Sequence, residues 1–236
     1  MENLKYMIAN AIATALEVEF VDYKHKLNLD TRNCFGSMKS DVINTKLKEV
    51  LTSDKYIIHG FKRHSWEGRL IIDLNSKSII SITSSSNLNR VSKDNNRKFP
   101  HYMQSILNYL NNKIETNKQI SFDVGKSFDY DDYEKDFKNI FCNLDLDLKE
   151  FTYYVVTYDY KNNILIEMNW YLLGSDFNIA EKESIMKLID PDFIDLTSLE
   201  NEFNYEQNNN EDGKPNKGIE LKLKGEKMKN KLNRGI

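Results

Sequence analysis

Apolar residues at helical and strand spacing divide the first part of the chain into two helices followed by three strands. Residues 4–20 and residues 40–52 each place apolar side chains on one helical face. Three short runs rich in β-branched and aromatic residues come next, and we predict them as strands: Tyr56–Phe61, Arg69–Leu74 and Ser78–Thr83. The last two flank the polar residues 75–77, which are typical of a hairpin turn.

A polar stretch then separates these strands from further helices. Residues 84–99, SSSNLNRVSKDNNRKF, are predicted as a loop, and Pro100 stands where a helix would begin. Apolar residues follow at the spacing of an amphipathic helix: Met103, Ile106, Leu107, Leu110 and Ile114. Asp129 opens another predicted helix, whose acidic residues fall in the first turns, where the helix dipole favours negative charge.

A second hairpin is predicted further along the chain, from Phe151–Tyr160 and Ile164–Leu172. The second of these strands alternates, and its apolar residues are expected on one face: Ile164, Ile166, Met168, Trp170 and Leu172. One buried and one wet face favour an antiparallel sheet. A last helix is predicted around residues 180–189, ending at Pro191.

These elements predict an α+β fold, with an antiparallel sheet of about five strands and helices packed on one face. We expect residues 1–202 to form this single domain. Residues 203–236 are expected to be a polar connector and a basic tail, largely flexible and disordered, because the connector has almost no apolar content.

The composition argues against a membrane or secreted protein. No run approaches the ~18 apolar residues that a membrane helix needs, and the N-terminus lacks the pattern of a signal peptide. Cys34 and Cys142 are far apart, and a chain with 40% hydrophobic residues needs no disulfide to build a core. We therefore expect two free thiols, a cytoplasmic location and no membrane partner.

Charge is segregated along the chain, although the formal net charge is only −3. Residues 55–120 contain eleven lysines and arginines against four acidic residues, whereas residues 121–212 contain seven against twenty-two. Residues 213–236 return to eight against two. Such asymmetry concerns binding partners and solubility rather than the fold.

The basic region contains the candidate binding residues. A dense cationic and aromatic cluster comes first: Lys62, Arg63, His64, Trp66 and Arg69. Four further cations lie in the polar stretch behind it: Arg90, Lys93, Arg97 and Lys98. Both groups suit phosphate contacts, with a tryptophan that stacks on a base or on a partner's side chain. The same residues also fit a solvated turn, a tryptophan packed into the sheet, and charges that serve solubility alone.

Little in the sequence points to catalysis. The common phosphate-loop, dinucleotide, serine-hydrolase and zinc-protease motifs are missing, and His59, His64 and His101 lack converging metal ligands. We expect no cofactor and no metal, and we interpret His101 as a surface or capping residue. Pro191-Asp192 with Glu220-Leu221-Lys222 spells the letters of a PD…ExK nuclease, in which the acids hold Mg²⁺.

Several residues carry a resemblance to a known group: Phe61-Lys62-Arg63, Trp66, Asp73, and Arg97 through His101-Tyr102. In its first half the chain resembles an uncharacterised family of proteins of ~200–240 residues from low-GC Gram-positive bacteria, their prophages and their phages. The resemblance implies no activity. It implies a setting in which small intracellular proteins act by binding host machinery.

The leading hypothesis is a non-enzymatic interaction protein, encoded by a phage or prophage, that inhibits or modulates a host protein or a protein–nucleic-acid complex. The basic region would contact an anionic surface, which includes nucleic acid, and the acidic region would face a basic groove. The alternative is a metal-dependent nuclease or another nucleic-acid enzyme. A third interpretation is an acidic-faced subunit of a larger assembly.

Overall fold

The computed structural model describes residues 1–190 except residues 28, 32, 64, 95 and 116–127. The chain divides into two units, Met1–Thr197 and Ser198–Ile236, and every described residue belongs to the first. The predicted connector and tail, residues 203–236, lie outside the described residues. Within the described part, no helix combines the length and the apolar composition needed to cross a bilayer.

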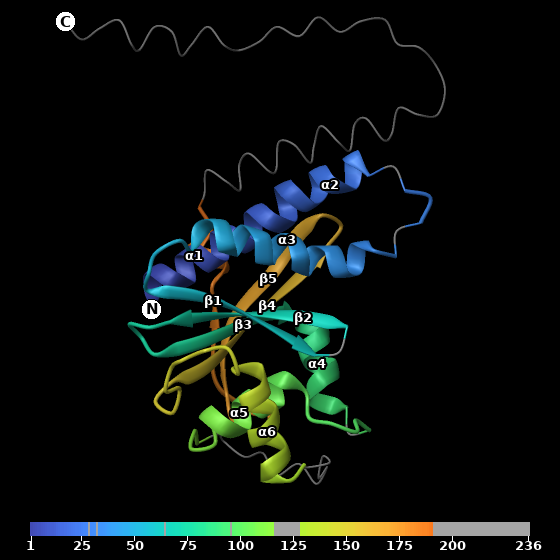
Figure 1. Cartoon of the computed structure of the whole chain (residues 1–236). Helices are drawn as coiled ribbons and strands as arrows, with labels where there is room; N and C mark the ends of the chain where they lie inside the picture. The colour runs from blue at the N-terminus through green and yellow to red at the C-terminus, as the bar shows by residue number, and fades with distance from the viewer. Residues whose placement is uncertain (28, 32, 64, 95, 116–127, 191–236) are drawn as a thin grey trace, which may run out of the picture. The chain divides into compact units, whose positions relative to one another are not determined.

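Six strands form one sheet in the order β1-β2-β3-β4-β5-β6 (Figure 1). Their bounds are β1 Tyr56–Arg63, β2 Trp66–Asp73, β3 Ser78–Ser84, β4 Thr152–Lys161, β5 Ile164–Leu173 and β6 Ile179–Ser184. Neighbours pair antiparallel except β3 and β4, which pair parallel. The α+β class is confirmed. The predicted sheet of about five strands has six, and it is mixed, so the prediction that it is antiparallel throughout is wrong.

The parallel pair explains a second error, the prediction that helices cover one face only. Parallel neighbours need a crossover connection, because the chain must return to the starting end of the sheet. Here the crossover contains α4 (Ser85–Lys93), α5 (Tyr102–Leu110) and α6 (Tyr130–Ile140). These helices pack on the face opposite the N-terminal helices, as Figure 1 shows.

The N-terminal helices build the core on the first face. They are α1 (Glu2–Ala13), a π-helical turn η1 (Thr14–Glu19), α2 (Phe20–Lys26) and α3 (Phe35–Val50). Alternation along the strands sends Ile71, Ile80 and Val156 into this core, whereas their neighbours Ile72, Ile79 and Val155 enter the core under α5 and α6. The central strands are therefore apolar on both faces.

Three local predictions also differ from the structure. The predicted loop 84–99 contains α4, which begins because the Ser84 hydroxyl accepts a hydrogen bond from the Asn87 amide at 3.2 Å. The predicted helix 180–189 is instead the edge strand β6, which pairs with β5, followed by a short 3-10 turn. A register shift in β5 leaves Ile164 and Ile166 exposed, so the predicted phase of this strand fails near its start.

Other predictions are confirmed. The strand runs of the first half appear where the pattern placed them, and α6 begins behind Asp129. The helix after Pro100 is present as α5, but it ends at Leu110, so the predicted position Ile114 lies beyond its end. Cys34 and Cys142 are both free and exposed.

A buried amide joins the crossover to the sheet. The ladder between β4 and β5 ends at the pair Tyr154–Leu172, one residue short of Tyr153 and Leu173. Asn111, at the end of α5, fills this position: its Nδ2 donates to the carbonyls of Tyr153 and Leu173, both at 2.8 Å. Its Oδ1 accepts from the Tyr153 amide at 3.0 Å. Three backbone groups that would otherwise be buried without partners are thereby satisfied.

We expect Asn111→Ala to lower the free energy of unfolding by about 2–4 kcal/mol, because buried backbone groups lose their partners. Chemical denaturation monitored by circular dichroism measures this. Asn112→Ala, at the exposed neighbouring position, is the control and should change stability by less than about 0.5 kcal/mol. Equal stability of the two variants would contradict the role of Asn111.

A glycine is required beneath the aromatic cluster of the first hairpin. A Cβ at Gly68 would overlap the ring of buried Phe61 and lie 2.7 Å from Trp66 Cη2. At Gly60, across the hairpin, a Cβ would meet only the guanidinium of Arg69, at 2.7 Å from Nη1. The Arg69 side chain is 41% exposed and can turn away.

We therefore expect Gly68→Ala to destabilise the protein by about 1–3 kcal/mol, because the packed Phe61 ring must shift. Gly60→Ala should leave stability unchanged or slightly raised, since alanine suits a strand better than glycine. Thermal unfolding of both variants tests this. A Gly68→Ala protein as stable as the wild type would show that the aromatic cluster adapts freely.

Candidate anion-binding site at the start of α5

The site centres on the N-terminus of α5, where the crossover meets the end of the β1–β2 hairpin. His101 caps the helix, because its Nδ1 accepts a hydrogen bond from the Met103 amide at 3.3 Å. Of the two predicted roles for His101, surface residue or cap, the structure shows the cap. Next to it, the buried ring of Tyr102 lies 5.2 Å from the Phe61 centroid and stacks on Trp66 at 5.4 Å.

Arg63, at the end of β1, fixes this part of the crossover to the hairpin. Its Nη2 donates to the Pro100 carbonyl at 2.9 Å and forms an ion pair with Asp136 of α6 at 2.9 Å. Asp136 also accepts a hydrogen bond from the Ser105 hydroxyl at 2.5 Å. The guanidinium therefore holds β1, the start of α5 and α6 together.

Arg97 closes the segment between α4 and α5. Its Nη2 donates to the carbonyls of Val91 at 2.6 Å and Asp94 at 3.1 Å. Burial lowers the pKa of Arg97; Asp94 opposes this shift, whereas the charges of Arg90 and Arg63 add to it. Its Nη1 is buried and has no hydrogen-bond partner within the described part of the chain, so the guanidinium is incompletely compensated.

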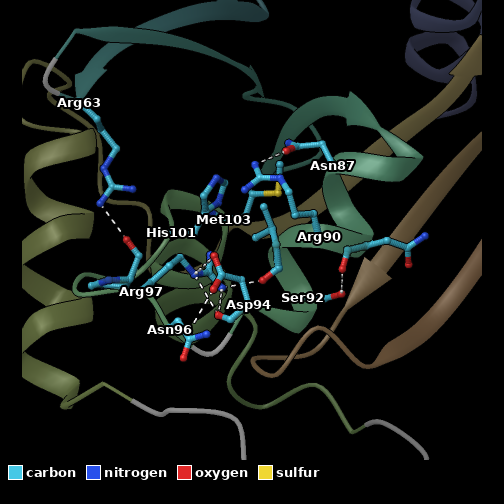
Figure 2. Close-up of polar contacts among 12 residues, drawn as sticks. Arg63, Asn87, Arg90, Ser92, Asp94, Asn96, Arg97, His101 and Met103 are labelled. Carbon is cyan, nitrogen blue, oxygen red and sulfur yellow. Dashed lines mark hydrogen bonds and ion pairs between the residues drawn. The ribbon is translucent and has the colours of Figure 1, made fainter.

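Arg90 supplies the outer charge of the site. It extends from the last turn of α4 and is exposed, and its Nη2 donates to the side-chain oxygen of Asn87 at 2.7 Å. Asn87 is neutral, and Arg90 has no ion pair with any residue that the structure describes. Figure 2 shows Arg63, Arg90 and Arg97 arranged around His101.

Burial, together with this surrounding charge, keeps the imidazole neutral. Burial, followed by the positive charges of Arg97, Arg63 and Arg90, lowers the pKa of His101 to about 3. A neutral ring whose Nδ1 caps a helix does not act as a general acid near neutral pH. What the arrangement can do is hold an anion, since guanidinium groups form charge-assisted hydrogen bonds with carboxylates and phosphates.

The structure brings part of the predicted set together and separates the rest. Arg63, Arg90 and Arg97 meet, although they come from different segments. Trp66 adjoins them through Tyr102 and is 49% exposed, so it is neither fully packed into the sheet nor fully free. His64 lies outside the described residues.

Arg69 lies on the opposite face of the sheet from Arg63. It pairs in register with Gly60, and it lines a small hollow with Asn44 and Leu47 of α3. Glu67 lies between Arg69, at 3.6 Å, and Lys62, at 2.8 Å, and so compensates both. Successive residues of a strand point to opposite faces of the sheet, and for this reason Arg69 lies on a different surface from Arg63.

The remaining predicted cations are open. Lys93 and Lys98 are exposed and form no ion pair with any described residue. A groove of about 330 Å³ begins at the residue after Lys98, and its lining includes Lys62, Arg63, Phe99 and Asp132. Phe99 and Asp136 were missed by the sequence analysis. The only sequence signal for Phe99 is an aromatic residue between a lysine and a proline.

The charge segregation along the chain is only partly kept in space. The ion pairs Arg63–Asp136 and Lys77–Glu150 each join the basic region to the acidic region. Among the described residues, no three His, Cys, Asp or Glu side chains are grouped to hold a metal ion. The nuclease candidates Asp192 and Glu220 lie outside the described residues, so that alternative stays a prediction.

Fold and site together define a class: an α+β protein with a six-stranded mixed sheet, helices on both faces, and a guanidinium-rich surface at one helix start. The chain belongs to DUF5986, a family of unknown function that matches residues 1–235. The predicted membership of an uncharacterised family is thus confirmed, over far more than the first half of the chain. No curated protein and no solved structure matches the chain.

The neutral state of His101 gives a prediction about pH. The pKa of His101 is about 3 in the folded protein and ~6.5 in the unfolded chain. Between these pH values the unfolded chain binds a proton on this histidine and the folded protein does not. Stability should therefore fall as the pH drops from 6.5 towards 3, by up to about 1.4 kcal/mol per unit from this group. His101→Asn keeps a capping oxygen but removes the titration.

We expect the wild type to lose about 2–3 kcal/mol more than His101→Asn between pH 7 and pH 4, as measured by urea denaturation across the range. The same exchange at His25, on the exposed surface of α2, controls for the loss of an imidazole. Parallel curves for wild type and His101→Asn would show that His101 does not resist protonation.

Proposed function

We propose that this protein is a non-enzymatic binding protein that holds an anionic partner on the basic surface around His101. The observation that carries the proposal is the arrangement of Arg63, Arg90 and Arg97 around His101, as Figure 2 shows. Only Asp94 and Asp136 form ion pairs with these three guanidinium groups among the described residues. The excess positive charge favours an anion in their field.

Within this surface the inner and outer cations have different tasks. Arg63 and Arg97 donate to backbone carbonyls and shape the site. Arg90, Lys93 and Lys98 are exposed and face no carboxylate within ion-pair distance among the described residues, so contact with the partner falls on them. These three form the outer cations of the site.

The sequence resemblance implies a phage or prophage protein that binds host machinery, and we include this in the proposal. The protein acts in the cytoplasm as an inhibitor or modulator encoded by a phage or prophage. Its partner is a host protein or a protein–nucleic-acid complex that presents negative charge.

Neutralising the outer cations should weaken binding to any polyanion. We expect the variant Arg90→Gln/Lys93→Gln/Lys98→Gln to elute from immobilised heparin at distinctly lower salt than the wild type, because it loses three phosphate- or sulfate-binding charges. Circular dichroism should show an unchanged fold, since none of the three side chains is buried.

The matched control removes the same charge elsewhere. Lys113, Lys149 and Lys161 are exposed lysines of other segments, and their triple replacement by glutamine should leave elution close to that of the wild type. The eight lysines and arginines of residues 213–236 are present in both variants, so the difference reports the site. Equal shifts in the two variants, or none, would reject the proposal.

A further inference from the structure

We infer that the anionic partner of this site is single-stranded nucleic acid, with a base stacked on Trp66 and phosphates along the outer cations. The inference rests on the proposed function and adds the class of partner. Its basis is an exposed, rigidly held aromatic ring beside the arginine cluster.

Trp66 has the properties of a stacking platform. The ring is 49% exposed, whereas the other tryptophan, Trp170, is 4% exposed. Tyr102 supports it in a stacked arrangement, with 26° between the ring planes, and Phe61 meets it edge-on at 5.6 Å. A ring fixed in this way loses little conformational freedom when a base stacks on its open surface.

A second exposed aromatic ring lies in the groove that Arg63 also lines. Phe99 is 69% exposed and sits between Lys98 and Pro100, whose carbonyl is bound by Arg63. Large apolar side chains at this exposure, beside free cations, are typical of surfaces that take up bases between charged backbone contacts. Trp66 is paired with Arg63 in the hairpin register, and Phe99 precedes the proline that Arg63 binds, so both rings lie near the Arg63 side chain.

Nearby acids restrict the path of the strand. Asp136 is compensated by Arg63 and Ser105, but Asp132 of α6 lines the groove beside Phe99. Phosphates are therefore excluded from the α6 side, except near Lys135, and favoured on the α4 side. On that side Arg90 and Lys93 stand in the last turn of α4, and Lys98 follows.

Single strands fit this surface better than duplexes. A duplex presents phosphates and base edges, while its base faces stay stacked inside. Stacking on an exposed indole requires an open base face, which a single strand offers. An acidic protein would satisfy the cations but would need an aromatic or arginine side chain at one position to stack on Trp66, whereas every base has a face that can stack.

The test uses the full-length protein with Trp170→Phe, which leaves Trp66 as the sole tryptophan. The probe is an oligothymidylate of ~12 nucleotides, within the usual site size. Saturable quenching of the Trp66 emission is expected at low salt. In parallel, anisotropy of the labelled oligonucleotide should show roughly 5- to 100-fold weaker binding for Trp66→Ala, and much less loss for Trp66→Phe.

The outcomes separate this inference from the proposed function. Two results together support both the inference and the proposed function. The oligonucleotide quenches the Trp66 emission, and the plot of log affinity against log salt concentration is shallower for the outer-cation variant than for the wild type, by a slope of about 2. A different outcome overturns the nucleic-acid partner and leaves the binding function. In that case retention on heparin depends on the outer cations, but the oligonucleotide does not quench Trp66 and binds the Trp66→Ala variant as tightly as the wild type. Tighter binding of duplex or polyglutamate than of the single strand also overturns the inference. Loss of all polyanion binding overturns both.

Discussion

The parallel pairing of β3 with β4 is the constraint on which the rest of the structure depends. β3 ends at Ser84 and β4 begins at Thr152, so the intervening chain must travel back along the sheet and cover its second face. That crossover contains Arg90, Arg97 and His101, and it packs on the hairpin that carries Arg63 and Trp66. The same connection therefore builds the second core and assembles the site.

Two of the polar links that hold the crossover in place work by different means. Asn111 is fully buried and uses a neutral amide, so it satisfies three backbone groups without the large desolvation cost of a buried charge. Arg63 and Asp136 lie nearer the surface, where an ion pair with additional hydrogen bonds is tolerated. In the core under α5 and α6, the neutral Asn111 amide thus makes contacts in the interior, and the Arg63–Asp136 ion pair makes contacts at the edge.

Sequence periodicity predicted the long elements because the apolar residues of each fall on one face in a helix or in a strand, but not in both. It failed where burial does not determine the structure: α4 depends on the Ser84 cap, and β6 on pairing with β5. The doubled apolar pairs Ile71-Ile72 and Val155-Val156 did contain the signal of a sheet covered on both faces. The site could be predicted only as two basic segments, since their meeting at His101 is tertiary.

The three arginines of the site have different partners, and this explains how several positive charges can lie close together. Like charges close together repel, and a protonated His101 would add a fourth. The fold avoids this by burying the imidazole as a neutral cap and by directing Arg63 and Arg97 to carbonyl oxygens and to Asp136 and Asp94. Among the described residues of the site, Arg90, Lys93 and Lys98 are the cations that are exposed and form no ion pair. Structural arginines thus shape a site whose attraction for an anion comes from the cations around its edge.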